Sequence, residues 1–164
     1  MRGYIISGKD LKMKETRSIL LIDDDSTDAI LFKRAVQNLE IANPLVHLTT
    51  CRMGLDYLKD PDNKKPWIVI TDLNTPDMSG HELLAAMKAD DALKHIIVIV
   101  LSGSGDERDV VECFKLGAAG YMIKPSEHKK LIEIIRTIHD YWTISELPQE
   151  NKQIVSKTSC SSTI

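Results

Sequence analysis

Short apolar runs alternate with helical patterns along most of this chain. The apolar runs cover residues 18–22, 45–49, 67–71, 96–101 and 120–123, and each is short enough for one strand. The segments that follow them, residues 28–39, 52–58, 80–88, 106–116 and 127–144, carry apolar residues at helical spacing. Five strand–helix units in this order predict an α/β domain in which helices cover both faces of a parallel sheet.

The helical spacing also predicts which side chains face the core. These residues are Ile30, Leu31, Ala35, Val36 and Leu39 in the first helix, Leu83, Leu84 and Met87 in the third, and Val110, Val111 and Phe114 in the fourth.

Right-handed crossovers restrict such a sheet to two common strand orders, the classical Rossmann order and the flavodoxin-like order 2-1-3-4-5. The first strand-to-helix turn, Asp23-Asp24-Asp25, is acidic and holds no glycine, which argues against a dinucleotide site there. Open sheets of this kind bind ligands at the carboxyl ends of the strands, where the strand order reverses. In the order 2-1-3-4-5 that point lies between strands 1 and 3.

The domain limits follow from composition. With 164 residues, of which 43% are hydrophobic, the chain can form one α/β domain with a full core. Residues 1–17 mix Lys, Arg, Gly and Ser with a few apolar residues, so we predict a flexible leader. Residues 148–164 are rich in Ser, Thr, Lys and Gln without periodicity, which is typical of a disordered tail. The domain is therefore predicted to cover residues 18–147.

Charge and cysteine usage narrow the partners and the compartment. The formal net charge of -3 gives no overall basic field, so we expect no nucleic acid partner. The longest apolar run, residues 96–101, is too short to span a bilayer, and we expect no membrane association. Cys51, Cys113 and Cys160 are widely spaced and odd in number, which favours a reducing compartment. We therefore expect a cytoplasmic protein.

Polar residues stand at the carboxyl ends of four predicted strands. Asp23 and Asp24 follow strand 1, Asp72 follows strand 3, Ser102 ends strand 4, and Lys124 follows strand 5. Clustered carboxylates repel one another unless a cation is present, and Mg2+ prefers oxygen ligands of this kind. A metal ion, an ammonium and a hydroxyl together suit a carboxylate that attacks phosphorus. Asp72 stands centrally, so it is the favoured nucleophile.

Each of these residues also has a purely structural interpretation. Asp25 and Ser26 would serve equally well as caps of the first helix, and a Lys-Pro pair such as Lys124-Pro125 is usually a turn. The combination of suitable residues at four strand ends favours the functional interpretation over the structural one.

The sequence resembles the receiver domain of response regulators, which has a CheY-like fold. The residues that carry this resemblance are ILLIDDDST, VITDLNTPDMSG, VIVLSGSG and GAAGYMIKP, within a match over residues 18–145. It implies the flavodoxin-like, doubly wound five-stranded sheet with order 2-1-3-4-5. It also implies a phosphoacceptor that catalyses its own phosphorylation and dephosphorylation, with Mg2+, and that is not otherwise an enzyme.

The resemblance assigns roles to individual residues. Asp72 is implied as the phosphoryl acceptor and a metal ligand, Asp24 as a direct ligand, and Asp23 as an acid that acts largely through water. Asn74 would offer its backbone carbonyl to the metal. The remaining roles fall on Ser102 and Lys124, which would bind the phosphoryl group, on Tyr121 as an aromatic switch, and on Pro125 after a cis peptide.

Two further segments, IIRTIHDYWTISELP and LLAAMKADDALKHIIVIVLS, are similar to stand-alone phytochrome-associated (Rcp-type) response regulators. This similarity implies a sensor histidine kinase as partner, with a bacterial phytochrome as one candidate, and output through protein contacts or onward phosphotransfer. Tyr141 and Trp142 either cap the core or contribute to a homodimer contact. The family's usual face, helix 4, strand 5 and helix 5, favours the contact.

A haloacid-dehalogenase-type phosphatase is the alternative. Asp23-Asp24-Asp25-Ser26-Thr27 satisfies that family's first motif, DxDxT, with Asp23 as nucleophile and Asp25 as general acid. The alternative is weaker because no suitable acidic pair follows Lys124 and because Asp72 has no role in it.

Overall fold

The computed structural model of this chain describes Gly8 and residues 16–148. The predicted leader, residues 1–17, and the predicted tail, residues 148–164, lie almost entirely outside these residues. The strands are β1 (Ile19–Ile22), β2 (Leu45–Leu48), β3 (Ile68–Thr71), β4 (Ile97–Ser102) and β5 (Gly120–Ile123). The helices are α2 (Ser26–Asn38), α3 (Cys51–Lys59), α4 (Gly80–Ala89), α5 (Glu107–Lys115) and α6 (His128–Ile144).

The strands form one sheet in the order β2-β1-β3-β4-β5. Every neighbouring pair is parallel, and Ile22 of β1 lies opposite both Leu48 of β2 and Thr71 of β3. The flavodoxin-like order is thereby confirmed and the Rossmann order is excluded. Strand order reverses between β1 and β3, so the carboxyl ends of these two strands meet at the predicted switch point.

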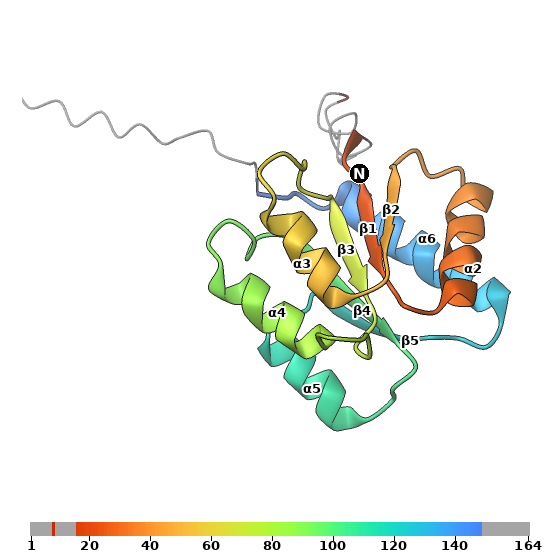
Figure 1. Ribbon diagram of the computed structural model, residues 1–164. Helices are drawn as coiled ribbons and strands as arrows, with labels where there is room; N and C mark the ends of the chain where they lie inside the picture. Colours follow the sequence, from red (N-terminus) through yellow and green to blue (C-terminus); the bar gives the residue numbers. More distant parts are fainter. Residues whose placement is uncertain (1–7, 9–15, 149–164) are drawn as a thin grey trace, which may run out of the picture.

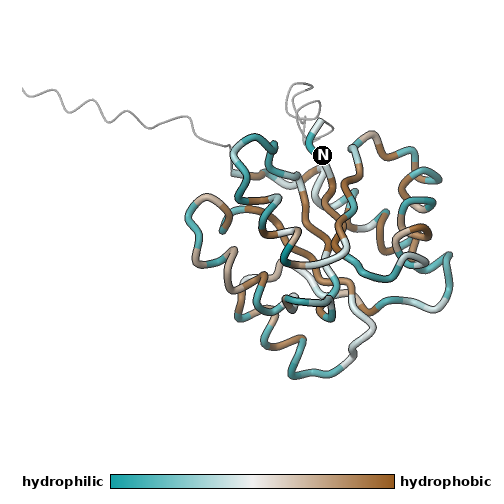
Figure 2. Tube along the Cα trace, viewed as in Figure 1, coloured by the Kyte–Doolittle hydropathy of each residue, from teal (hydrophilic) through white to brown (hydrophobic). Residues whose placement is uncertain are grey.

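Helices cover both faces of the sheet, as predicted (Figure 1). α3, α4 and α5 lie on one face, and α2 and α6 lie together on the other. Side chains alternate along each strand, so Leu20 and Ile22 join the first core while Ile19 and Leu21 join the second. Both faces are buried, which is why the strands are continuously apolar and appear as a brown centre in Figure 2.

The predicted core-facing residues are confirmed in α4 and only partly in two other helices. Leu83, Leu84 and Met87 are buried. Ile30 is 51% exposed, and Phe32 is buried in α2 instead. In α5 the prediction for Val111 and Phe114 was wrong.

These two side chains of α5 are 45% and 52% exposed respectively, whereas Cys113 between them is fully buried. Adjacent helical positions are about 100° apart, so a nine-residue helix that buries a narrow face at Cys113 must expose its neighbours.

Among the described residues, no helix is both long and apolar enough to cross a membrane.

Candidate phosphoryl-transfer site

The sheet brings the predicted site residues together by extending its hydrogen bonds one residue past the strands. Asp23 N donates to Leu48 O at 3.0 Å, and Asp72 N donates to Ile22 O at 2.9 Å. On the other side, Lys124 N donates to Ser102 O at 2.8 Å. The backbone of each of these residues is therefore fixed at the same edge of the sheet.

The start of α2 separates the three consecutive acids. The Asp25 carboxylate accepts hydrogen bonds from Thr27 N at 2.8 Å and Asp28 N at 3.1 Å, so Asp25 is the N-cap of α2. The structural interpretation of Asp25 is confirmed, while Ser26 is the first helical residue rather than the cap. A carboxylate occupied in this way does not suit a general acid, which weakens the dehalogenase-type alternative further.

Lys124 lies at the centre of the site. Its Nζ lies 2.8 Å from Oδ2 of each of three carboxylates, Asp23, Asp28 and Asp72. The lysine side chain is only 17% exposed. Burial by itself would lower the pKa of Lys124, but the hydrogen bonds to the three carboxylates outweigh it and raise the pKa above its ordinary value. The lysine therefore stays an ammonium throughout the physiological range.

One ammonium does not balance the acids around it. Burial raises the pKa of Asp23 despite the hydrogen bonds that it receives from Lys124 and from the Asp25 backbone. Asp23, Asp24 and Asp72 each offer an oxygen within 4.8 Å of the others, and Asp24 is exposed to solvent. Three carboxylate oxygens with access to water are a donor set that suits Mg2+.

A tight loop between β3 and α4 positions the acceptor. Leu73 N donates to Asp72 Oδ1 at 2.6 Å, and Gly80 N donates to Leu73 O at 2.8 Å. A Cβ on Gly80 would lie 2.8 Å from Asp72 O, so only glycine allows this close approach. Thr75 ties the loop to α3, because its Oγ1 accepts from Cys51 N at 3.0 Å. Asn74 lies in this loop, and its predicted role as a metal ligand stays a prediction.

The residues after β4 form a second hydrogen-bonded group. Ser102 is fully buried, and its Oγ accepts from Ser104 N at 3.3 Å. Ser104 Oγ donates to Asp109 Oδ2 at 2.6 Å, and Tyr121 OH donates to Ser104 O at 2.9 Å. Ser102 and Tyr121 are thus both hydrogen-bonded to Ser104 in the loop after β4. The phosphoryl-binding role of Ser102 and the switch role of Tyr121 stay predictions.

Two features differ from the sequence-based expectations. The Lys124-Pro125 peptide is trans, because there is no cis peptide among the described residues, so the expected cis peptide was wrong. The trans form is also the one that an X-Pro bond favours intrinsically. Asp28 was missed altogether, since an acid in the first turn of a helix is common and nothing in the sequence pairs it with Lys124.

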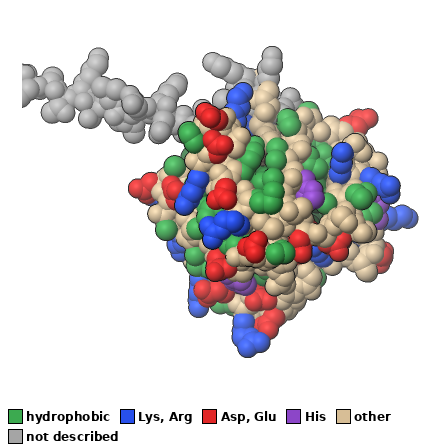
Figure 3. All heavy atoms as spheres, in the orientation of Figure 1, with side chains coloured by type: hydrophobic (Ala, Val, Ile, Leu, Met, Phe, Trp, Pro, Cys, Tyr) green, Lys and Arg blue, Asp and Glu red, His purple; other side chains and the backbone are tan. Residues whose placement is uncertain are grey.

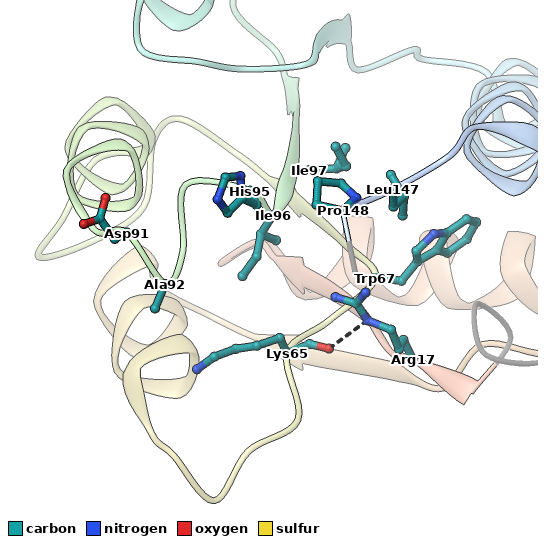
Figure 4. A pocket seen from close by; sticks show the side chains of 10 residues that line it. All are labelled: Arg17, Lys65, Trp67, Asp91, Ala92, His95, Ile96, Ile97, Leu147 and Pro148. Atoms are coloured by element: carbon teal, nitrogen blue, oxygen red, sulfur yellow. Dashed lines mark hydrogen bonds between the residues drawn. The ribbon is translucent and has the colours of Figure 1, made fainter. Parts of the chain in front are cut away.

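A cavity of about 330 Å³ lies at the opposite end of the sheet (Figure 4). Its lining includes Arg17, Trp67 and Ile97, which precede or begin β1, β3 and β4. Arg17 Nε donates to Lys65 O at 3.3 Å across its rim. The cavity is therefore separate from the acidic site. On the molecular face drawn in Figure 3, acidic and basic side chains are interspersed.

Comparison with known proteins agrees with this geometry. The family model described as the response regulator receiver domain matches residues 19–136. A probable methanogenesis regulatory protein, FilR2 of Methanothrix harundinacea, is 30% identical over 83% of this chain and 90% of its own length. Response regulator Rcp1 of Synechocystis sp. is 29% identical over 76% of this chain and 87% of its own length.

Solved structures give the same result. The crystal structure of the phosphorylated cyanobacterial phytochrome response regulator RcpA matches with a TM-score of 0.76 and 29% identity, over 82% of this chain and 99% of that one. The Mn2+-bound form of Rcp1 matches with a TM-score of 0.75 and 28% identity, over 81% of this chain and 99% of that one.

Proposed function

Because the chain belongs to the response regulator receiver domain family, we propose that it accepts a phosphoryl group on Asp72 from a sensor histidine kinase. The observation that carries the proposal is the position of Asp72. Its side chain is 11% exposed, its Oδ1 accepts from Leu73 N, and its Oδ2 accepts from Lys124 Nζ. A carboxylate held at both oxygens is oriented for attack before the donor arrives.

The transfer forms one bond and breaks another. An Asp72 carboxylate oxygen bonds to the phosphorus of a phosphohistidine, and the bond from phosphorus to the ring nitrogen breaks. The nitrogen leaves with the bonding pair and takes up a proton. Lys124 transfers a hydrogen bond from Asp72 to a phosphoryl oxygen, and the Ser102 hydroxyl donates another.

Asp23, Asp24 and Asp72, together with the Asn74 carbonyl, would hold Mg2+, which supplies positive charge to the phosphoryl oxygens when it is bound. Gly103 leaves this side of the pocket open, since a Cβ there would meet no atom within 4 Å. This open space supports the approach of a kinase phosphohistidine to Asp72.

The similarity to RcpA and Rcp1 supports a phytochrome-like kinase as the partner. Such a kinase presents its phosphohistidine in the cytoplasm, so we place the protein there. We propose that output uses the face formed by α5, β5 and α6, either in a homodimer or with another protein. Exposed apolar side chains are present on these elements, namely Val111, Phe114, Ile123 and Tyr141.

Phosphoramidate tests the proposal because its P–N bond resembles that of phosphohistidine. With Mg2+, we expect a phosphorylated protein by intact mass, none after chelation of the metal, and none in Asp72→Asn. Asp25→Asn is the control. It removes a neighbouring negative charge, and the helix keeps its cap because Asn is as good an N-cap residue as Asp. Rapid hydrolysis of p-nitrophenyl phosphate by the Asp72→Asn protein would instead support a phosphatase that uses Asp23.

A further inference from the structure

Asp28 is a carboxylate at this site that the proposed transfer leaves without a role. Its Oδ2 lies 2.8 Å from Lys124 Nζ, as do the Oδ2 atoms of Asp23 and Asp72. Asp28 is not in the group of carboxylates close enough to share a metal ion. Its contact with the site is therefore with the lysine rather than with the metal position.

The start of α2 holds Asp28 in this position. Asp28 lies in the first turn of the helix, where its backbone N donates to the Asp25 cap at 3.1 Å. A negative charge in the first turn is stabilised by the helix dipole. Its side chain is 40% exposed, compared with 4% for Asp23, so Asp28 holds Lys124 from the rim of the pocket.

The Lys124 ammonium has three N–H donors, and three carboxylates surround it. Phosphorylation changes how these donors are shared. Once Asp72 bonds to phosphorus, its oxygen is a weaker acceptor, and the phosphoryl oxygens require positive charge instead. Asp28 is not altered by the transfer, so it retains its hydrogen bond to the lysine.

We propose that Asp28 is a positioning residue that draws the Lys124 ammonium toward the rim of the pocket and withholds part of its charge from the incoming phosphoryl group. The proposal rests on the proposed function of Asp72. Its consequence is that Asp28 favours the metal-bound, unphosphorylated site over the phosphorylated one.

Removal of the Asp28 charge should therefore move two measurements in opposite directions. Without Asp28, Lys124 binds Asp23 and Asp72 more closely and competes with Mg2+ for their oxygens, so we expect Mg2+ affinity to fall about five-fold. At saturating Mg2+, the ammonium is more available to the phosphoryl oxygens, so the phosphorylation rate should rise about five-fold. Structural damage would lower both.

The experiment compares Asp28→Asn with Asp28→Glu and with the control Asp25→Asn. Calorimetric titration with Mg2+ measures affinity, and intact mass measures phosphorylation by acetyl phosphate. In that reaction the Asp72 oxygen bonds to phosphorus, the bond from phosphorus to the acetate oxygen breaks, and acetate leaves with the electron pair. Asp28→Glu keeps the charge and Asp25→Asn does not touch Lys124, so both should behave like the unaltered protein.

Opposite shifts in Asp28→Asn alone support the proposal. It is overturned if Asp28→Asn matches Asp25→Asn, if affinity and rate fall together, or if Asp28→Glu behaves like Asp28→Asn. Should Asp28→Asn fail to unfold cooperatively on heating, Asp28→Ser takes its place under the same criteria. An unaltered protein that gains no phosphoryl group on Asp72 would refute the proposed function itself, which separates the two failures.

Discussion

Asp23 is a buried carboxylate. The effect of its lost hydration on its pKa is larger than the opposite effect of the hydrogen bond from Lys124. Burial raises its pKa, while hydrogen bonds from Lys124 and from the Asp25 backbone lower it by less. The folded state therefore binds a proton at Asp23 more tightly than the unfolded state does. It follows that ionised Asp23 costs folding free energy at every pH above its raised pKa.

Replacement of Asp23 by Asn should stabilise the protein at neutral pH when no divalent cation is present. The gain should shrink as the pH falls through the raised pKa of Asp23 and vanish near the ordinary value of 3.8, where the native residue is also neutral. Urea unfolding across this range measures it. With saturating Mg2+ the order should reverse, because the cation stabilises only the folded native site. An Asp23→Asn protein that is less stable at neutral pH without cations would contradict this account.

For individual residues, the sequence predicts which polar residues follow the strands, but it does not predict which side chains they contact. Asp23, Asp72 and Lys124 were predictable because a parallel sheet brings strand ends to one edge. The contact between Lys124 and Asp28 joins residues 96 positions apart and depends on how α2 is rotated about its axis. The trans peptide at Pro125 agrees with the intrinsic preference of an X-Pro bond, about 0.5–1 kcal/mol, whereas the cis form was expected only from the family resemblance.

At the scale of elements, the helices begin and end within about two residues of the predicted positions. Among the described helices, α2, α3, α4 and α5 begin at a side-chain N-cap, which is a local sequence feature. At α4, Ser79 and Glu82 form a capping box. The rotation of α5 was not predictable in this way, since Val110, Val111, Cys113 and Phe114 allow more than one apolar face. Tertiary packing selects the face at Cys113.

Two substitutions in α5 test that assignment. Cys113→Ser places a hydroxyl in the core and should cost about 1–3 kcal/mol of unfolding free energy. Phe114→Ser changes a side chain that is 52% exposed and should alter stability by no more than about 0.5 kcal/mol. Chemical denaturation of both variants makes the comparison, and equal losses would show that α5 is rotated differently.

At the scale of the whole molecule, the aromatic pair at the end of α6 has two different environments. Trp142 packs against the core beside α2 and α6, whereas Tyr141 is 59% exposed. The rings meet edge to face, with centroids 4.8 Å apart. Trp142 therefore fits the interpretation as a cap of the core, and Tyr141 is the better candidate for a homodimer contact.

Phosphorylation-dependent dimerisation, measured by light scattering, tests this division. If the α5, β5 and α6 face forms the contact, Tyr141→Ala should weaken the dimer by about ten-fold without loss of thermal stability. Trp142→Ala should lower thermal stability, because it removes a side chain that packs on the core. A Tyr141→Ala protein that dimerises normally would count against a contact at this end of α6.

For the whole molecule, connection rules restricted the strand order to two, and the family resemblance selected the order 2-1-3-4-5 that the sheet has. The edge that carries the site was predictable from strand polarity. The central claim is that this edge makes Asp72 the phosphoryl acceptor. The most direct measurement is peptide mass mapping after incubation with acetyl phosphate and Mg2+. We expect a single acid-stable but base-labile acyl phosphate on Asp72, absent in Asp72→Asn. A phosphoryl group on Asp23 in the unaltered protein would contradict the account.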